Sequence, residues 1–193
     1  MATKKIFILL GNPDTDTYSG KLADSYQAGA EAAGHDVFRV NINDLNFDPV
    51  LHKGYKEIQA LEPDLIEVQE RIYWADHLVI IYPNWWCAMP ALLKGLFDRI
   101  WLPGFAFSFD KDINKPSPRL SGKTARVIII TGSHSPFSTW WRYGDFTNEI
   151  QHGILGFAGV KAAISAFGPT QKVDEKKKTE WLQQVKKLGE SGR

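Results

Sequence analysis

Five short apolar runs that alternate with helical segments constrain the fold of this chain more than any other feature. The runs cover residues 5–10, 36–40, 77–82, 124–130 and 161–167. Each is nearly continuous in hydrophobic residues, which is typical of strands buried on both faces. We therefore expect an α/β fold, a doubly wound five-stranded parallel sheet with helices on both faces. The pattern alone leaves two strand orders open, 2-1-3-4-5 and a short Rossmann order.

Turn and cap residues divide the segments between these runs. Ser19 is expected to cap the first helix, Pro63 and Pro90 to stand near the starts of two others, and Gly189 to end the last. Residues 131–144 are expected to form an exit loop after the fourth strand, and residues 103–121 an irregular excursion. No linker, repeat or low-complexity tract interrupts the chain, which predicts a single domain over residues 1–193.

Composition excludes several classes of protein. The 193 residues carry a formal net charge of +1, which does not indicate a nucleic-acid or anionic-membrane binder. One cysteine excludes an intrachain disulfide and a cysteine-rich zinc site, and no histidine or carboxylate spacing indicates a metal site. No apolar stretch reaches transmembrane length, and the first residues do not resemble a signal peptide. We expect a cytoplasmic protein without membrane insertion.

The segment 83–90, with adjacent Trp85 and Trp86, directly follows the third strand. Ligands of open α/β folds bind at the carboxyl edge of the sheet, where this segment would lie. Two aromatic rings there could form the wall of a site for a flat, conjugated cofactor, or they could fill a core. Residues alone support these two readings equally, and tryptophans of this kind also occur in dimer interfaces.

In the order 2-1-3-4-5, this tryptophan loop converges with the loops 11–19 and 131–144. The first of these is rich in small and hydroxylic side chains and precedes a helix, where backbone N–H groups favour an anion. An ordinary helix cap explains the same residues. There is no G-x-G-x-x-G after the first strand, no Walker A sequence and no G-x-S-x-G, so dinucleotide-binding Rossmann, P-loop and hydrolase readings lose their main support.

Two longer motifs carry a resemblance. Residues 82–99, Tyr-Pro-Asn-Trp-Trp-Cys-Ala-Met-Pro-Ala-Leu-Leu-Lys-Gly-Leu-Phe-Asp-Arg, resemble the most specific motif of the flavodoxin-like NAD(P)H dehydrogenase (quinone) family, in its short bacterial form. Residues 10–23 are similar to the family's opening motif, and residues 104–109 and 152–159 to later segments. The resemblance implies a flavodoxin-like fold with strand order 2-1-3-4-5.

It also implies an activity. Members of this family are NAD(P)H-dependent flavoenzymes, usually homodimers, that reduce quinones and similar acceptors by two electrons in a ping-pong mechanism. The implied cofactor is FAD, with FMN as the alternative, and NAD(P)H is the co-substrate. The implied cofactor-binding residues are Asn12, Thr17, Tyr18, Ser19, Pro83, Asn84, Trp85, Trp86, Cys87, Thr131, Gly132 and Ser133. Asn12 stands where the family usually has histidine.

The same resemblance points to residues beside the flavin. Tyr143, Arg142 or His134 would stabilise negative charge on the reduced cofactor, and Phe105, Phe107 and Trp140 would shape the acceptor pocket, in part across a dimer interface. Two other roles fit a bound flavin: an electron-transfer flavodoxin, and a redox-sensing accessory subunit of a membrane transporter. Electron-transfer flavodoxins are usually strongly acidic, so the near-neutral charge counts against the first.

Overall fold

The computed structural model describes residues 2–109 and 116–193. The elements, in chain order, are β1 (Lys5–Leu10), α1 (Tyr18–Ala32), β2 (Asp36–Asn41), η1 (Ile42–Asp44), η2 (Gly54–Lys56), α2 (Pro63–Trp74), β3 (His77–Pro83), α3 (Ala91–Ile100), β4 (Phe107–Ser108), β5 (Ser117–Pro118), β6 (Thr124–Ile130), α4 (Pro136–Tyr143), the π-helix η3 (Glu149–Gly156), β7 (Lys161–Phe167) and α5 (Glu175–Ser191).

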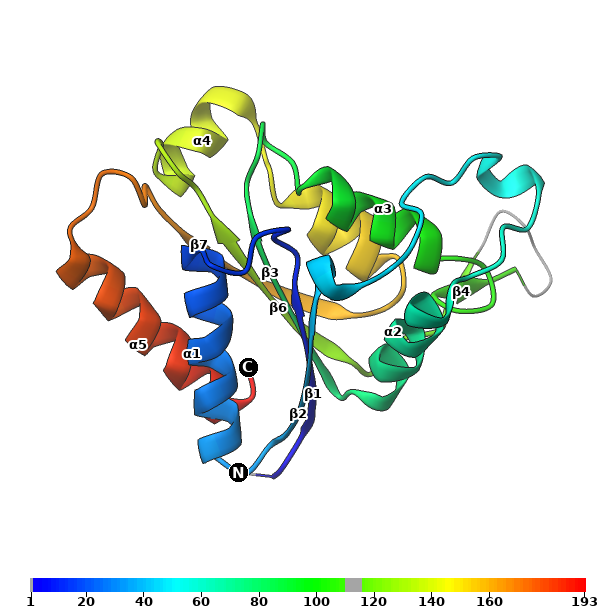
Figure 1. The fold of residues 1–193 in the computed structure, drawn as a ribbon, viewed down its shortest axis with the longest axis horizontal. Helices are drawn as coiled ribbons and strands as arrows, with labels where there is room; N and C mark the ends of the chain where they lie inside the picture. Colours follow the sequence, from blue (N-terminus) through cyan, green and yellow to red (C-terminus); the bar gives the residue numbers. More distant parts are fainter. Residues whose placement is uncertain (1, 110–115) are drawn as a thin grey trace.

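Five strands form one parallel sheet in the order β2-β1-β3-β6-β7. Numbering only these strands gives 2-1-3-4-5, so the expected order is confirmed and the short Rossmann order is wrong. Helices α1 and α5 cover one face of the sheet, and α2, α3 and η3 cover the other (Figure 1). The switch in strand order lies between β1 and β3, and ligands of open α/β sheets bind at the carboxyl edge near such a point.

The core explains why the strands read as continuous apolar runs. Along β1, Ile6, Ile8 and Leu10 pack toward α1 and α5, whereas Phe7 and Leu9 belong to the cluster under α2 and α3. All five side chains are fully or almost fully buried. Because successive strand residues face opposite sides, a strand covered on both faces needs a hydrophobic residue at every position.

Three sequence expectations about helix bounds are wrong. Thr17, not Ser19, is the N-cap of α1, and its side chain accepts a hydrogen bond from Gly20 N. Helix α4 stands inside the expected exit loop 131–144, capped by Ser135, with Pro136 in the first turn. Helix α5 continues through Gly189 to Ser191. A Cβ at Gly189 would lie 2.1 Å from the Tyr26 carbonyl oxygen of α1. This glycine permits the close crossing of two helices and does not end one.

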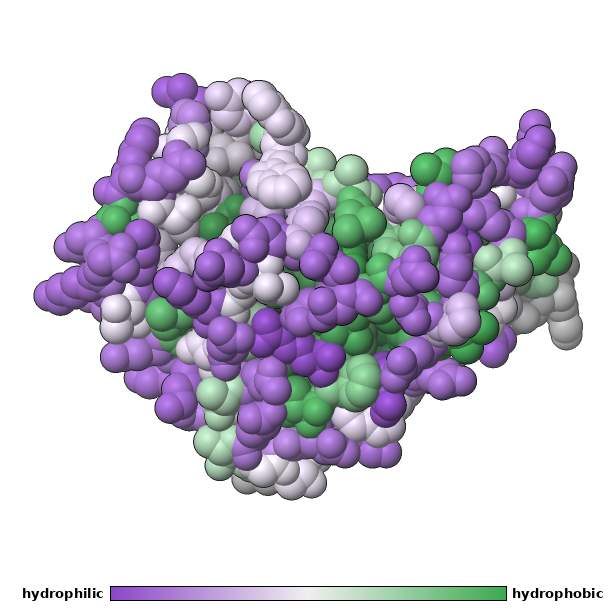
Figure 2. All heavy atoms as spheres, in the orientation of Figure 1, coloured by the Kyte–Doolittle hydropathy of each residue, from purple (hydrophilic) through white to green (hydrophobic). Residues whose placement is uncertain are grey.

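Two excursions leave the layered core. In the stretch 103–121, β4 and β5 pair antiparallel with Phe107 opposite Pro118, and its residues 110–115 lie outside the described residues. The second excursion, residues 45–62, connects η1 to α2 and contains η2. The molecule is notched along its upper edge between α4 and this second excursion, and hydrophobic residues gather at the base of the notch (Figure 2).

Candidate active site

The first loop, between β1 and α1, is organised around Asn12. The Asn12 side chain is buried, and its Nδ2 donates to Thr17 Oγ1 at 3.0 Å and to Ser19 Oγ at 3.4 Å. The loop folds back closely over the first turn of the helix: a Cβ at Gly20 would lie 2.0 Å from the Thr15 carbonyl oxygen. The N–H groups of the first helical turn have no acceptor within the helix, so this end of α1 suits a phosphate.

Tyr18, the first residue of α1, turns its side chain away from this loop. Its hydroxyl donates to the Lys178 carbonyl oxygen at 2.8 Å, and its ring packs against Trp181 with centroids 6.4 Å apart. Burial, and secondarily the charge of Glu175, raise the pKa of Tyr18 to about 12. Its backbone N–H, rather than its hydroxyl, is therefore the group available to a ligand at this helix end.

The tryptophan loop forms a two-residue hairpin turn. Trp85 N donates to the Ala88 carbonyl oxygen at 2.9 Å, and Ala88 N donates to the Trp85 carbonyl oxygen at 3.0 Å. The two central residues have left-handed backbones, with φ of 55° at Trp86 and 63° at Cys87. A turn with φ > 0 at both central positions normally contains Asn-Gly or a similar pair. Non-glycine residues in this conformation cost roughly 1–2 kcal/mol each, a strain that is characteristic of functional sites.

Exposure decides between the two readings of the adjacent tryptophans. Trp86 is fully exposed and Trp85 is 48% exposed, so neither ring fills the core. The left-handed turn presents the Trp86 ring at the carboxyl edge of the sheet.

A cavity of about 350 Å³ joins this turn to the loop after β6 and to α4. Its lining residues are Asn84, Trp86, Cys87, Thr131, Gly132, Ser133, His134, Thr139 and Tyr143. Of the expected cofactor residues, it thus brings together those of the second and third loops except Pro83 and Trp85. Asn12, Thr17 and Ser19 form their own cluster at the start of α1.

The cavity lining is rich in hydrogen-bond donors. Within the described residues, the backbone N–H groups of Trp86, Cys87, Gly132 and Ser133 donate to no protein acceptor. No carboxylate from the described part of the chain lines the cavity. Free N–H donors without an opposing carboxylate suit the carbonyl oxygens and ring nitrogens of a flavin, on which negative charge develops during reduction.

Helix α4 supplies the remaining wall, including a residue that the sequence reading missed. Thr139 is buried and lines the cavity, and its Oγ1 donates to the Ser135 carbonyl oxygen at 3.0 Å. Tyr143 follows one turn later on the same face, and its ring meets His134 edge-on with centroids 6.0 Å apart. The Ser135-Pro136 pair is a helix-start signal that would have placed positions 139 and 143 together.

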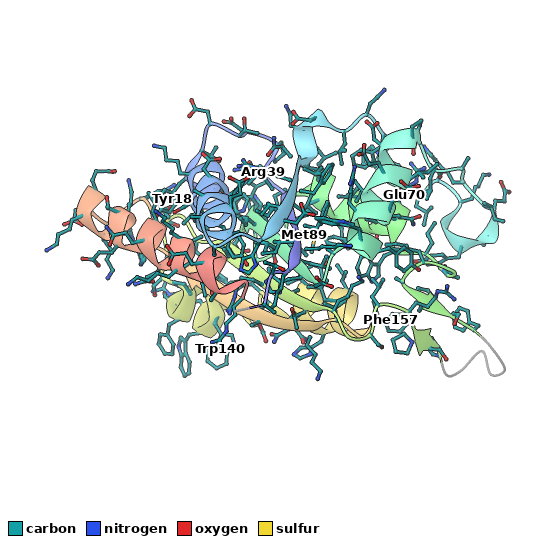
Figure 3. The ribbon with its side chains drawn as sticks, turned by 90° about the horizontal axis from the view of Figure 1, so that it is seen from below. Tyr18, Arg39, Glu70, Met89, Trp140 and Phe157 are labelled. Atoms are coloured by element: carbon teal, nitrogen blue, oxygen red, sulfur yellow. The ribbon has the colours of Figure 1, made fainter. Side chains whose placement is uncertain are left out.

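The other residues expected around the flavin lie elsewhere. Trp140 points outward from α4, away from the sheet (Figure 3), and neither Trp140 nor Arg142 lines the cavity. Phe105 is buried in the core, where it packs edge-on against Tyr73 and Trp101.

Phe107 lines a second cavity, of about 490 Å³, on the α3 and η3 side. Its lining residues are Tyr55, Lys94, Phe97, Asp98, Trp101, Pro103, Phe107, Phe109, Gly153, Ile154 and Phe157. The two cavities share no lining residue.

Comparison with known proteins decides the family. The family described as having a flavodoxin-like fold matches residues 4–188. The chain belongs to this family. The expected membership among the flavodoxin-like quinone reductases is thereby confirmed.

Individual known proteins share modest identity with nearly the whole chain. The ribosyldihydronicotinamide dehydrogenase [quinone] of Rattus norvegicus is 28% identical, over 97% of this chain and 93% of its own. The structure of NAD(P)H:quinone oxidoreductase from Methanothermobacter marburgensis has a TM-score of 0.82 at 23% identity, covering all of both chains. An FMN-dependent NADH-azoreductase from Bacillus anthracis, in complex with FMN, has a TM-score of 0.68 at 21% identity, covering 98% and 97%. At these identities the two structures establish the shared fold.

The described residues contain no group of three or more His, Cys, Asp or Glu side chains that could hold a metal ion. Among the helices of residues 2–109 and 116–193, none is both long and apolar enough to cross a bilayer.

Proposed function

We propose that this chain is a flavin-dependent NAD(P)H oxidoreductase that reduces quinones or similar acceptors by two electrons. A bound flavin supplies the hydride chemistry, and NAD(P)H and the acceptor occupy the same place in turn, which gives ping-pong kinetics. The observation that carries the proposal is the cavity in which the left-handed Trp86–Cys87 turn faces residues 131–134. The cavity offers an exposed aromatic ring and free N–H donors, and the family match of the chain supports the same function.

Each part of the site has a distinct task in this proposal. Asn84 and Trp86 form the side of the cavity against which the flat ring system lies, and the free N–H groups of the turn and of Gly132 orient it. The Asn12–Thr17–Ser19 cluster and the N-terminus of α1 hold the phosphate. We propose FAD as the cofactor, with FMN as the alternative. Orientation and exclusion of water are the protein's main contribution.

Stabilisation of the reduced cofactor falls to α4 and the loop before it. Tyr143 and His134 line the cavity and can donate hydrogen bonds to negative charge there. Arg142 lies next to Tyr143 without lining the cavity, so its contribution would be a longer-range positive charge. We assign the direct role to Tyr143 and His134.

The proposed acceptor pocket combines residues from two copies of the chain. Phe107, Phe109 and Phe157 line the second cavity, which shares no residue with the flavin cavity. We propose that an acceptor contacts the flavin of one subunit and this aromatic cluster of the other, in a homodimer with two-fold symmetry.

The test begins with the purified protein's absorbance spectrum and with mass analysis of the released cofactor. We expect a yellow protein that oxidises NAD(P)H with menadione as acceptor. Trp86→Ala should lower flavin affinity and turnover at least roughly tenfold, since one base-sized aromatic contact contributes about 1–3 kcal/mol. Trp141→Ala, on the outer side of α4, is the matched control and should change neither.

The same measurements separate the alternatives. A protein that takes up neither FAD nor FMN contradicts the proposal. Bound flavin with negligible turnover across quinones and nitro compounds would favour the redox-sensing accessory subunit, and rapid one-electron exchange with a carrier protein would favour the flavodoxin.

A further inference from the structure

Arg99, near the end of α3, is the most deeply buried charged side chain outside the candidate active site. Its Nη2 donates to Glu62 Oε2 and to the Ala60 carbonyl oxygen, both at 2.8 Å. Its Nη1 donates to Glu62 Oε1 at 3.2 Å and to the Asp48 carbonyl oxygen. All of these acceptors belong to the excursion 45–62, and one of them, Glu62, is also the N-cap of α2.

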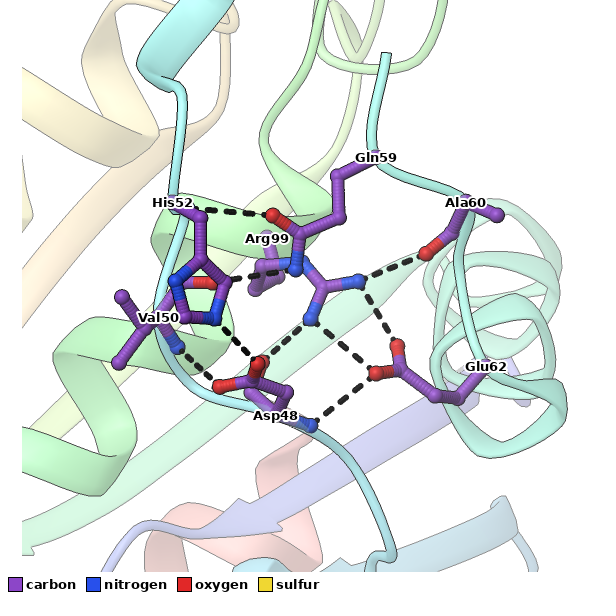
Figure 4. A network of polar contacts seen from close by, with 7 residues as sticks. All are labelled: Asp48, Val50, His52, Gln59, Ala60, Glu62 and Arg99. Carbon is purple, nitrogen blue, oxygen red and sulfur yellow. Dashed lines mark hydrogen bonds and ion pairs between the residues drawn. The ribbon is translucent and has the colours of Figure 1, made fainter. Parts of the chain in front are cut away.

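From Arg99 the contacts continue outward through the excursion (Figure 4). Asp48 N donates to Glu62 Oε1 at 3.1 Å, and the Asp48 carboxylate accepts from Val50 N at 2.9 Å and contacts His52 Nε2 at 2.7 Å. Gln59 closes the loop, because its amide donates to the Val50 carbonyl oxygen and accepts from His52 N. We call these side chains, Asp48, His52, Gln59, Glu62 and Arg99, the Arg99 network.

The excursion also rests directly on the backbone of α3. A Cβ at Gly95, one turn before Arg99, would lie 2.5 Å from Pro49 Cβ and 2.7 Å from the Pro49 carbonyl oxygen. The glycine contact and the Arg99 network therefore fix the base of the excursion to α3 at two consecutive helical turns.

The tip of the excursion carries Tyr55 to the second cavity. Tyr55 is 73% exposed, yet it lines this cavity together with Lys94 and Asp98 of α3, which are paired at 2.7 Å. Ile58, three residues further along, is fully exposed and does not line the cavity. Tyr55 therefore lines the cavity from an exposed loop, and the contacts that fix this loop lie at its base, around the buried Arg99.

We propose that Tyr55 is a specificity-determining wall of the acceptor pocket and that Arg99 is the positioning residue that holds it there. This inference rests on the proposed function for the assignment of the second cavity to the acceptor. Lysine cannot replace Arg99 in this role, because a single ammonium does not supply the planar fork that reaches three acceptor groups. Lysine does keep a positive charge beside the partly exposed Glu62 carboxylate, so this carboxylate retains an ion-pair partner.

The test compares variants with two acceptors of different size, 1,4-benzoquinone and the larger menadione. Tyr55→Ala should raise KM for menadione roughly tenfold, the effect of removing one wall contact, with kcat and KM for benzoquinone within about twofold. Tyr55→Phe should restore the wild-type ratio, and Ile58→Ala, on the same excursion, should leave it unchanged. Arg99→Lys should shift the ratio as Tyr55→Ala does, and the double variant should shift it no further.

Two outcomes of this comparison overturn the inference. They are an unchanged menadione KM in Tyr55→Ala and fully additive effects in the double variant. If Arg99→Lys does not fold, the Tyr55 variants and Gln59→Ala test the inference instead. Gln59→Ala removes contacts at the exposed side of the excursion and should shift the menadione-to-benzoquinone KM ratio in the same direction as Tyr55→Ala.

Equilibrium dialysis of menadione separates this inference from the proposed function. A chain that reduces no quinone but binds menadione in a Tyr55-dependent way contradicts the proposed function and supports the wall. A chain that reduces menadione independently of Tyr55 supports the proposed function and contradicts the wall role of Tyr55. A chain that neither binds nor reduces menadione overturns both.

Discussion

Asn12 and Thr17 are joined across the first loop by a hydrogen bond of 3.0 Å from Asn12 Nδ2 to Thr17 Oγ1. The acceptor is the N-cap side chain of α1, which also accepts from Gly20 N at 3.4 Å. Helix capping and loop closure therefore depend on the same oxygen atom. A ligand phosphate at this helix end would meet a loop whose side chains are already arranged before it binds.

Removing that oxygen should affect stability and cofactor affinity together. We expect Thr17→Ala to lower the free energy of unfolding by about 1 kcal/mol, the usual cost of losing an N-cap, and to weaken flavin binding. Thr17→Ser keeps the oxygen and should retain both. Urea unfolding of the flavin-free protein and a flavin titration measure the two effects, and a Thr17→Ser variant as impaired as Thr17→Ala would contradict this account.

The left-handed turn predicts an unusual effect of glycine. In flavin-free protein, Cys87→Gly should be more stable than Cys87→Ala by about 1 kcal/mol, because glycine adopts a φ near 63° without steric cost and alanine does not. Both variants lack the thiol, so their difference isolates the backbone contribution. Thermal unfolding measures it. Equal midpoints for the two variants would show that the turn relaxes in solution.

Tyr143 is expected to act through its hydroxyl. Tyr143→Phe should lower turnover at least roughly tenfold while leaving the bound flavin content unchanged, since one donor to developing charge is lost and the ring is kept. Trp141→Phe is a comparable aromatic change on the outer side of the same helix and serves as the control. A turnover unchanged in Tyr143→Phe would transfer the role to His134, which the corresponding His134→Gln variant would then reveal.

His77 at the start of β3 should make the fold sensitive to acid. Burial, together with the nearby charges of Lys4, Arg126 and His35, lowers the pKa of His77 from its ordinary 6.5 to about 3. The unfolded chain therefore binds a proton more readily, so the contribution of His77 to stability is intact above about pH 6.5. It declines by up to roughly 1.4 kcal/mol for each pH unit between pH 6.5 and 3.

Urea unfolding at several pH values checks this prediction. His77→Gln should flatten the dependence in that window, whereas the control His152→Gln, at an exposed position, should preserve it. Parallel slopes for His77→Gln and wild type would mean that other groups dominate acid unfolding.

The sheet could be predicted from the sequence almost residue by residue, because a strand buried on both faces leaves an unbroken apolar run. β1, β6 and β7 have the expected bounds. Helix α4 was missed for a physical reason: it is short and exposed, and its tryptophans face solvent rather than the core. Its polar face, with Thr139, is the buried one, so hydrophobic periodicity gives no signal there.

The candidate site was likewise predictable only in part. The strand order predicted that three loops converge at one edge of the sheet, and the cavity at the left-handed turn brings together residues from two of them. The left-handed turn at 86–87 was not predictable, since Trp and Cys lack the small or amide side chains that signal positive φ. The Arg99 network was equally hidden, because its partners lie 37 to 51 residues away along the chain.

The full exposure of Trp86 gives the protein an intrinsic optical reporter. Trp101 and Trp181 are buried, so a collisional quencher such as iodide will act mainly on the exposed indoles, of which Trp86 is the most accessible. A ligand that covers the left-handed turn must shield this indole. Iodide quenching in the presence and absence of each quinone or nucleotide would therefore follow occupancy of the cavity without any chemical turnover.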